Sequence, residues 1–494
     1  MNKTDWTKAQ RYRPYHQWPS DYQVALQQKV AQSVWRLGYH VQPVTGLLND
    51  PNGFSYYNGK WQLFYQAYPF GPVHGLKSWY HVTSTNLVDW KNEGLKLLPT
   101  NDFDGQGVYS GSALPYEDRL FLAYTGNVRK HDWSRHSYQL GAWMDQTGAI
   151  EKIQQPLLTE QPSGYTTEFR DPQVFPYQGG YLMVIGAQDT AEIGQVLTYY
   201  SEDLLHWDLV GKLHFSDEKL GFMVECPNLL LFEDAALLLF CPQGLDLAIC
   251  SYKNIYPNMY VTAAGYSLEE NRLLQPSSIK NLDEGFDVYA TQGFIAPDGR
   301  CLTVSWVGLP EIDYPSDKEG WAHCLSQVKE CTIKNGRLYQ TPVAEMAALR
   351  LGEGQKIAPS HKEIVAEQNQ YEIILDFEAG ATGEVRLFAG LEENTGFTLS
   401  FDGVRGKIQL DRSQTGYSFA EEYGTSRSFS IEPGPVSLQI FVDHSLVEIF
   451  INDGAYTATA RVFPTEGQHG CQITCAQNFS GTFWPLRDMI TNKG

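Results

Sequence analysis

Three carboxylates in this chain stand where an extended stretch begins: Asp50, Asp171 and Glu225. Pro51 and Pro172 follow the two aspartates directly and hold them in extended backbone. Clustered carboxylates can serve as nucleophile or base and as general acid, because burial and mutual repulsion separate their pKa values. Such a set is typical of a glycosidase. Taken singly, each acid could instead only shape a turn, as Asp before proline often does.

The spacing of polar clusters argues for more than isolated turns. From Asp50 through Ser110, Asp171, Glu225 and Asp287, the intervals are 60, 61, 54 and 62 residues. Five nearly equal steps predict five blades of a β-propeller over residues 38–343, each sending its first strand toward a shared axis. The three carboxylates would then meet in one axial funnel. Asp287 shares the period, but its apolar neighbours predict a structural role.

The rest of the chain divides into recognisable segments. The stretch Ser84–Trp90 is echoed by Ser201–Trp207, 117 residues later, which fits two repeat units. Helical periodicity is confined to residues 22–37 and 344–351, so we expect an N-terminal helical extension over 1–37 and a linker over 344–359. Alternating apolar strands and glycine-rich turns predict an antiparallel β-sandwich over 360–494. The fold class is therefore all-β, a five-bladed β-propeller followed by a C-terminal β-sandwich.

The amino-acid composition restricts the classes of ligand and partner that the protein can be expected to bind. The 37 Lys and Arg against 57 Asp and Glu give a net charge of −20, which disfavours nucleic acid and requires local cations for any anionic ligand. The first 27 residues lack the apolar core of a signal peptide, and no run approaches the ~18 apolar residues of a membrane span. Eight scattered cysteines without CxxC spacing predict reduced, buried thiols. We expect a cytoplasmic monomer or homodimer with no membrane partner.

An ordered series of motifs resembles glycoside hydrolase family 32, the β-fructofuranosidases, and most closely the bacterial members that act on sucrose 6-phosphate. The motifs are Asn49-Asp50-Pro51-Asn52-Gly53, Phe64-Tyr65-Gln66 with Pro69, Tyr109-Ser110-Gly111-Ser112, Phe169-Arg170-Asp171-Pro172, Glu225-Cys226-Pro227, Phe286-Asp287-Val288-Tyr289-Ala290 and, near the C-terminus, Asp443-His444-Ser445-Leu446-Val447-Glu448-Ile449-Phe450. The resemblance extends over nearly the whole chain from about Trp35.

The resemblance implies a retaining hydrolase of β-fructofuranosyl bonds that needs no metal or cofactor. By it, Asp50 is the nucleophile that forms a covalent fructosyl-enzyme, and Glu225 is the acid and base. Asp171 would hold fructose hydroxyls and support the transition state, with Arg170 beside it as a donor. Hydrogen bonds to the sugar ring would come from Asn49, Gln66 and Ser110. Apolar walls would come from Tyr109, Tyr289 and Trp306, although each is equally compatible with a core position.

The local sequence also predicts the protonation of the two main carboxyls. Glu225 has apolar neighbours at 222–224, which would raise its pKa and keep it protonated as an acid. Asp50 has Asn49 and Asn52 nearby as donors, which would favour an ionised nucleophile.

The segment 70–79 departs from the pattern of many family members. His74 stands near the place where many relatives carry a tryptophan, and Lys77 follows it; Trp79 is followed by Tyr80 instead of the frequent glycine. The form with His and Lys resembles the group that acts on sucrose 6-phosphate, and both cations could bind a phosphate at the funnel mouth. A solvent-facing loop with an incidental cation is the alternative. Trp79 is included among the expected substrate contacts.

Other functions remain open at this point. An invertase or fructan hydrolase would act on unphosphorylated sugar with the same carboxylates. An arabinan-type five-bladed hydrolase would share the trio but would not explain the C-terminal motifs, where we expect Asp443 and Glu448 to be structural. A carbohydrate-binding propeller without catalysis would have no need for a nucleophile, an acid and a stabilising carboxylate together.

Overall fold

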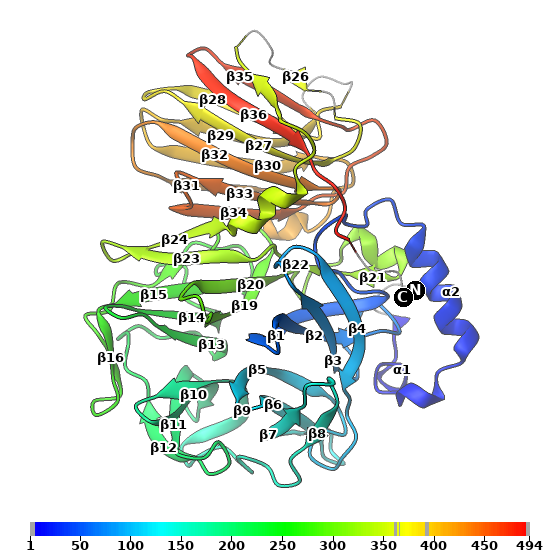
Figure 1. Cartoon of the computed structure of the whole chain (residues 1–494), viewed down its shortest axis with the longest axis vertical. Coiled ribbons are helices and arrows are strands. Elements are labelled where there is room, and N and C mark those ends of the chain that lie inside the picture. The colour runs from blue at the N-terminus through cyan, green and yellow to red at the C-terminus, as the bar shows by residue number, and fades with distance from the viewer. Residues whose placement is uncertain (1–4, 360–362, 365, 391–394, 491–494) are drawn as a thin grey trace.

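Two β-rich modules lie end to end along the long axis of the molecule (Figure 1). The computed structural model describes residues 5–359, 363–364, 366–390 and 395–490. The module below in Figure 1 is a propeller and the module above it is a sandwich, which confirms the fold class predicted from the sequence. Residues 1–4 of the expected extension, and 360–362 where the sandwich was expected to begin, lie outside the described residues.

Within the described residues, five antiparallel sheets of four main strands form the blades. They comprise β1 (Gly46–Tyr57), β2 (Lys60–Tyr68), β3 (Ser78–Ser84) and β4 (Trp90–Leu97); β5 (Val108–Tyr116), β6 (Arg119–Arg129), β7 (Arg135–Met144) and β8 (Ile150–Lys152); β9 (Tyr165–Tyr177), β10 (Gly180–Asp189), β11 (Gly194–Ser201) and β12 (Asp208–Lys212); β13 (Met223–Leu231), β14 (Ala236–Gln243), β15 (Met259–Ala263) and β18 (Lys280–Asn281); and β19 (Val288–Ile295), β20 (Cys301–Val307), β23 (Lys329–Lys334) and β24 (Arg337–Pro342).

Short elements complete the propeller. A small hairpin of β16 (Gly265–Ser267) and β17 (Arg272–Leu274) stands apart from the fourth blade, and β22 (Cys324–Leu325) pairs with β20. After the 3₁₀ turn η3 (Pro315–Glu319), β21 (Trp321–Ala322) pairs in parallel with β1. The chain that follows the inner strands of the fifth blade therefore returns to the first blade and ties the circle together.

The first strands of the five blades, β1, β5, β9, β13 and β19, contact one another in a closed circle around the axis. Each of them slips in register against its second strand at the same level, and these bulges fall at residues 48–51, 108–111, 170–173, 225–228 and 289–292. A bulge bends a strand and re-aims its side chains. The bulges therefore present one group of polar side chains from all five blades at one end of the axis.

Directly beyond the bulges, a ring of five hydrogen bonds links each first strand to the next. In every blade a buried polar side chain accepts from a backbone N–H of the neighbouring blade, at donor–acceptor distances of 2.8 to 3.2 Å. The pairs are Asn52 with Gly111, Ser112 with Val174, Gln173 with Leu229, Asn228 with Gly293, and Gln292 with Phe54. The last pair joins the fifth blade to the first, so the polar ring closes.

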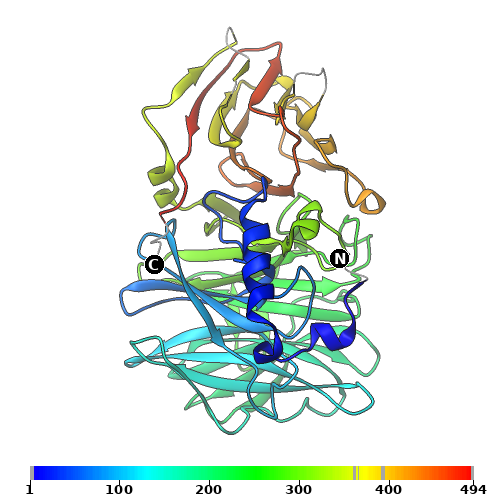
Figure 2. The same ribbon diagram turned by 90° about the vertical axis from the view of Figure 1, so that its right-hand side faces the viewer.

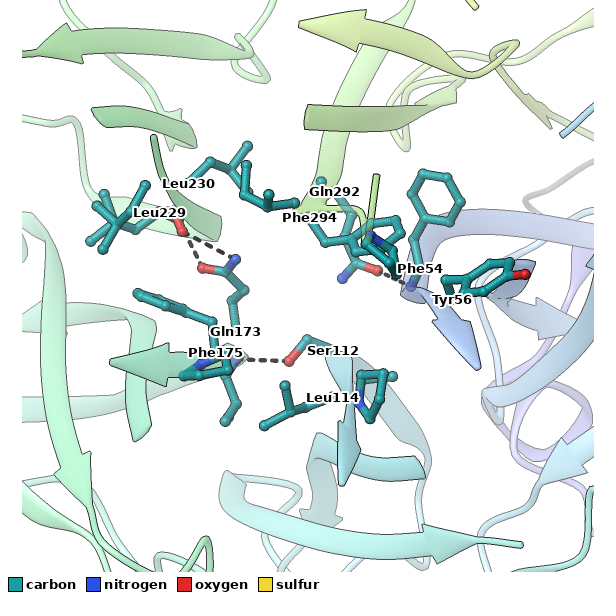
Figure 3. A pocket seen from close by; sticks show the side chains of 18 residues that line it. Phe54, Tyr56, Ser112, Leu114, Gln173, Phe175, Leu229, Leu230, Gln292 and Phe294 are labelled. Atoms are coloured by element: carbon teal, nitrogen blue, oxygen red, sulfur yellow. Dashed lines mark hydrogen bonds between the residues drawn. The ribbon is translucent and has the colours of Figure 1, made fainter. Parts of the chain in front are cut away.

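Past the polar ring, the far end of the axis holds an apolar cavity of about 450 Å³ (Figure 3). Its walls include Phe54, Leu114, Phe175, Leu230 and Phe294, one side chain from each first strand. Figure 3 shows Ser112, Gln173 and Gln292 of the polar ring at the edge of this space. The axis therefore changes from polar at the bulges to apolar at the opposite face.

The sandwich consists of two sheets of six strands among the described residues. One contains β25 (Gln355–Ile357), β36 (Phe479–Pro485), β27 (Gln370–Phe377), β32 (Val436–Asp443), β33 (Leu446–Ile451) and β34 (Tyr456–Arg461); the other contains β26 (Glu363–Ile364), β35 (Cys471–Cys475), β28 (Thr382–Leu387), β29 (Gly396–Asp402), β30 (Lys407–Gln414) and β31 (Ser426–Ser430). Two 3₁₀ turns, η4 (Ala344–Leu349) and η5 (Glu421–Tyr423), lie outside the sheets. Although β25 falls in the expected linker, it pairs with β36.

Charged groups of the C-terminal motif join the two modules. His40 is buried between Asp443 and Glu448, with its ring nitrogens 2.8 Å and 2.9 Å from their carboxylate oxygens. Asp443 also accepts the backbone N–H groups of Gly38 and Tyr39, and Lys329 lies 3.5 Å from Glu448. These contacts give both acids a structural place at the junction of the modules.

Asp287 also has structural contacts. It accepts hydrogen bonds from the Tyr314 hydroxyl at 2.7 Å, from Arg412 at 2.9 Å and from the backbone N–H of Arg461 at 2.8 Å. Since Arg412 and Arg461 belong to the sandwich, this buried carboxylate is a second charged link between the modules.

The N-terminal extension packs against the side of the propeller (Figure 2). It contains α1 (Lys8–Arg11), the 3₁₀ turn η2 (Tyr15–Gln17) and α2 (Ser20–Ala31), so the helix ends six residues before the expected 37. The helix stops before the periodic pattern ends, because the residues after Ala31 make tertiary contacts instead. Trp35 turns into the core against Phe463, and its carbonyl accepts the hydroxyl of Ser445 in the sandwich.

The echoed heptapeptides occupy equivalent places two blades apart. Ser84–Trp90 joins β3 to β4 in the first blade, and Ser201–Trp207 joins β11 to β12 in the third. In both turns the tryptophan Nε1 donates to the carbonyl three residues earlier, Leu87 or Leu204. The two-unit interpretation of the 117-residue interval is therefore confirmed.

All eight cysteines are buried, as expected for small core residues. The helices of the described residues are all too short or too polar to cross a membrane.

We expect the polar ring to contribute measurably to propeller stability. Gln292→Met removes the acceptor for Phe54 N–H and the donor for Gly111 carbonyl, which leaves two buried backbone groups without partners. A loss of about 3 kcal/mol, or roughly 6 °C in melting temperature, follows for the propeller transition. Differential scanning calorimetry against the exposed control Gln355→Met checks this; equal melting temperatures for the two variants would contradict it.

The junction of the modules should be sensitive to alkaline pH. Burial alone would lower the pKa of His40, but hydrogen bonds to Asp443 and Glu448 outweigh it and raise the pKa to about 9. The stabilisation is therefore complete below the unfolded pKa of about 6.5 and is lost as the pH rises through about 9. Melting temperatures from pH 6 to 10 should fall more steeply for the parent protein than for His40→Gln, and parallel curves would refute the assignment.

Candidate active site

The three carboxylates singled out by the sequence lie together at the bulged ends of β1, β9 and β13. Cys226 connects them: its backbone N–H donates to Asp171 Oδ2 at 3.0 Å, and its Sγ lies 3.5 Å from Asp171 and 3.7 Å from Asp50. Glu225 is its chain neighbour, and the charge of Glu225 acts on both aspartates. The convergence on one axis that the repeat period predicts therefore brings together side chains up to 175 residues apart, and we keep the name funnel for this end of the axis.

Asp50 is surrounded by hydrogen-bond donors. The Ser110 hydroxyl donates to Oδ2 and the Asn49 amide donates to Oδ1 at 3.0 Å. Gln66 then links both donors, because it accepts from Asn49 at 2.8 Å and donates to Ser110 at 2.6 Å. Burial raises the pKa of Asp50, while these donors and the charge of Lys77 oppose that rise. The carboxylate is held in place on both oxygens.

Asn52 has a different role from the one expected. Its amide donates to the backbone carbonyl of Asp50 at 2.8 Å, and its oxygen accepts Gly111 N–H in the polar ring. Asn52 therefore fixes the backbone below Asp50 and leaves the carboxylate to Asn49 and Ser110.

Asp171 sits in strained backbone, with φ at 69°. Its N–H donates to the hydroxyl of Thr125 at 3.0 Å, and its carboxylate accepts from Cys226. Burial and the charges of Glu225 and Asp50 raise its pKa to about 7, against the opposing charge of Arg170. Such a carboxyl, poised near neutrality beside the other two, is suited to exchanging hydrogen bonds with sugar hydroxyls.

Glu225 has polar partners, so the expected apolar surroundings are wrong. Arg170 donates to Oε1 through Nε at 2.9 Å, and Tyr289 and Gln243 each donate to Oε2 at 2.6 Å. Val224 is indeed buried, but adjacent residues of a strand point to opposite faces, so it does not surround the Glu225 carboxyl. Tyr289 was expected as an apolar wall and instead orients this carboxyl.

The remaining aromatic residues form layers around the funnel. Tyr109 is partly exposed, whereas Trp79 is fully buried behind it and donates through Nε1 to the Tyr109 carbonyl at 2.9 Å. The expected contact of Trp79 with substrate is therefore wrong, because its side chain supports Tyr109 from the core. Trp306 is 2% exposed, with the rings of His74 and Tyr289 6.1 Å and 5.9 Å away.

Lys77 lies inside the protein, so its expected position at the funnel mouth is wrong. The side chain is buried, and Nζ donates to the Asn49 oxygen next to Asp50. Burial lowers the pKa of Lys77 to about 7, in spite of the charge of Asp50. Its positive charge therefore acts on the Asp50 carboxylate and lowers the pKa of that group. His74, three residues earlier, is only partly buried.

Three further residues of the site had no signal in the sequence, and the role of a fourth was not expected. Gln243 reaches Glu225 from the second strand of the fourth blade, Thr125 holds Asp171 from the second blade, and Glu168 binds Arg170. Cys226 was expected to be only a small buried hydrophobe. The repeat period marks first strands alone, so contacts from second strands and from residues beside a motif could not be found in this way.

This arrangement defines a class of enzyme. Two carboxyls face one funnel, one held by neutral amide and hydroxyl donors and the other by arginine, tyrosine and glutamine, with a third carboxyl between them. On a five-bladed propeller joined to a sandwich, such a set is the equipment of a glycoside hydrolase. The chain belongs to glycosyl hydrolases family 32: the family's N-terminal domain matches residues 40–342 and its C-terminal domain matches residues 345–485.

Individual relatives and solved structures are consistent with this family assignment. The chain is 48% identical to a sucrose-6-phosphate hydrolase of Pediococcus pentosaceus, over 93% of this chain and 92% of that protein, and 44% identical to one of Streptococcus mutans, over 97% and 98%. The structure of sucrose-6-phosphate hydrolase from Lactobacillus gasseri superposes with a TM-score of 0.95 at 42% identity, covering 98% of this chain and all of that one. The β-fructofuranosidase of Bombyx mori gives 0.82 at 28% identity, over 95% and 98%.

The buried Lys77 should set the pH dependence of the reaction. Its positive charge lowers the pKa of Asp50, so Lys77→Met should raise that pKa and move the acidic limb of the kcat/KM profile to higher pH. At pH 6 we expect a loss of about tenfold or more with sucrose as substrate. Initial rates from pH 4.5 to 8 check this against the exposed control Lys60→Met; an unmoved acidic limb would show that Lys77 does not act on the reacting carboxylate.

Proposed function

We propose that the protein hydrolyses the β-fructofuranosyl bond of sucrose 6-phosphate, and also that of sucrose, to glucose 6-phosphate or glucose and fructose. The observation that carries this is that Asp50 and Glu225 lie close enough for their charges to interact, while each carboxylate is held by its own set of donors. The sequence similarity to sucrose-6-phosphate hydrolases over more than nine-tenths of the chain supports the phosphorylated substrate.

In the first step, Asp50 attacks the anomeric carbon of the fructosyl unit while Glu225 gives a proton to the departing glycosidic oxygen. The C–O bond to the glucosyl unit breaks, and a covalent fructosyl-enzyme forms on Asp50. Ser110 and Asn49 hold the attacking carboxylate, and Arg170, Tyr289 and Gln243 hold the acid. The positions of both groups are thus fixed before the substrate arrives.

In the second step, Glu225 takes a proton from water, which attacks the same carbon and releases Asp50. Two displacements at one carbon retain its configuration. Asp171 accepts hydrogen bonds from fructose hydroxyls and supports the positive charge that develops in both transition states. Asn49, Gln66 and Ser110 are the proposed ring contacts, with Tyr109 and His74 around the outer part of the funnel. Trp306 was expected as a wall, but it is 2% exposed and packs behind His74 instead.

We further infer a cytoplasmic enzyme, since its cysteines are buried thiols and the proposed substrate is a phosphorylated sugar. The net charge of −20 supports a sugar rather than a nucleic acid as partner, and we retain the expectation of a monomer or homodimer.

Comparing substrates tests this proposal. The purified protein should release fructose from sucrose 6-phosphate with the highest kcat/KM, from sucrose more slowly and from inulin least. Asp50→Asn and Glu225→Gln should each lose about 10⁴-fold in kcat on sucrose 6-phosphate, since each group makes or breaks a bond. The matched control Asp402→Asn changes a partly exposed carboxylate of the sandwich and should keep full activity.

The relative rates on the three sugars distinguish the proposed function from its alternatives. Equal or better activity on sucrose or inulin would indicate an invertase or fructan hydrolase. The absence of fructose release from all three sugars would favour a binding propeller. In methanol–water mixtures, nuclear magnetic resonance should show methyl β-fructofuranoside as the first transfer product; the α-anomer would exclude the two-step mechanism.

A further inference from the structure

Cationic side chains gather on one rim of the funnel, although the chain carries a net charge of −20. The adjoining ends of β6 and β7 contribute Arg129 and Arg135, which pair in the ladder, and β9 contributes Arg170. All three act on a single carboxylate, Glu168, and together they lower its pKa against the effect of burial. Because Arg170 is also paired with Glu225, the three arginines outnumber their two acids.

These charges form a path from the proposed acid to solvent. Glu225 binds Arg170 at 2.8 Å, Arg170 binds Glu168, and Glu168 binds Arg135 at 2.8 Å. Side-chain exposure is 8% at Arg170, 21% at Arg135 and 34% at Glu168. The fructosyl unit occupies the deep end at Asp50, so the leaving sugar must extend from Glu225 toward this outer rim.

The rim has donors to spare. Nε of Arg129 and Nε of Arg135 are both buried and have no hydrogen-bond partner within the described part of the chain. Arg129 reaches the Trp133 carbonyl only at 3.5 Å. The Arg135 guanidinium lies 5.8 Å from the Tyr109 ring, on the wall of the funnel. Beyond these buried nitrogens both side chains are partly exposed. A guanidinium with spare donors is suited to a phosphate, which accepts several charge-assisted hydrogen bonds.

The N-terminal extension completes this rim. Lys8 lies 3.3 Å above the ring of Trp133, and Tyr12 packs edge-on against the same ring at 5.2 Å. The Tyr12 hydroxyl lies within the electrostatic range of Tyr109, Arg129 and Arg135. The extension thus packs on Trp133, in the turn that joins the two arginines, and adds a hydroxyl near them.

We propose that Arg129 and Arg135, with the hydroxyls of Tyr12 and Tyr109, bind the phosphate of the leaving glucose 6-phosphate. This specificity site rests on the proposed function and replaces Lys77 as the cation that meets the phosphate, because Lys77 is buried against Asn49 at the other end of the funnel. The phosphate finds two cations at the rim, and the field of an acidic protein is reversed locally.

The experiment compares the parent protein with Arg129→Gln, Arg135→Gln and the double variant on sucrose 6-phosphate and on sucrose. The double variant should lose about 30-fold or more in kcat/KM on sucrose 6-phosphate and less than threefold on sucrose. Arg405→Gln, which removes the same charge from an exposed turn of the sandwich, is the matched control and should leave both values unchanged. Calorimetric binding of glucose 6-phosphate should weaken in parallel, while binding of glucose should not.

The outcomes separate this site from the proposed function. A parent preference for sucrose 6-phosphate that survives in the double variant overturns the arginine site alone. Equal losses on both sugars also overturn it, because they indicate a structural role through Glu168 and Arg170. Should the parent protein release no fructose from either sugar, the proposed function fails, and calorimetry still decides the site: binding of glucose 6-phosphate that Arg129→Gln abolishes supports it, and unchanged or absent binding overturns it.

Discussion

The ring of five hydrogen bonds around the propeller axis is the constraint on which the rest of the structure depends. Blades of a propeller bury their faces against each other, but apolar contact alone leaves their relative height undefined. Each polar side chain of the ring fixes one neighbouring backbone N–H, so the five first strands share one level. Because these groups are buried, a shift of one blade would leave at least one of them without a partner, at a cost of about 1–3 kcal/mol.

The common level of the five first strands also sets the positions of the active-site residues. Asp50, Ser110, Asp171, Glu225 and Tyr289 each lie two or three residues before a member of the ring. The bulges between them require unusual backbone, with positive φ at Asp171, Cys226 and Ala290. Strain of this kind costs of the order of 1–3 kcal/mol at each residue and persists only where the surroundings hold it. Here the polar ring on one side and the hydrogen bonds of the active site on the other keep these residues in their strained conformation.

The sequence was sufficient for the architecture and for the carboxylates, because both follow from one period. A motif that recurs about every 60 residues marks the same strand in each blade, and strands on one axis bring their motifs together. What lies beside a motif could not be found in this way. The partners of Glu225 come from other strands and from another blade, and the depth of Lys77 depends on how loop 70–77 folds over the first blade. The end of α2 depended on where the sandwich holds Trp35, a contact across more than 400 residues.

The polar ring also limits the routes by which sugars can enter and leave the site. Its five buried side chains lie across the axis between the carboxylates and the apolar cavity. For the proposed reaction, the funnel is a blind passage: the leaving sugar must go out through the mouth by which it entered before water can take its place.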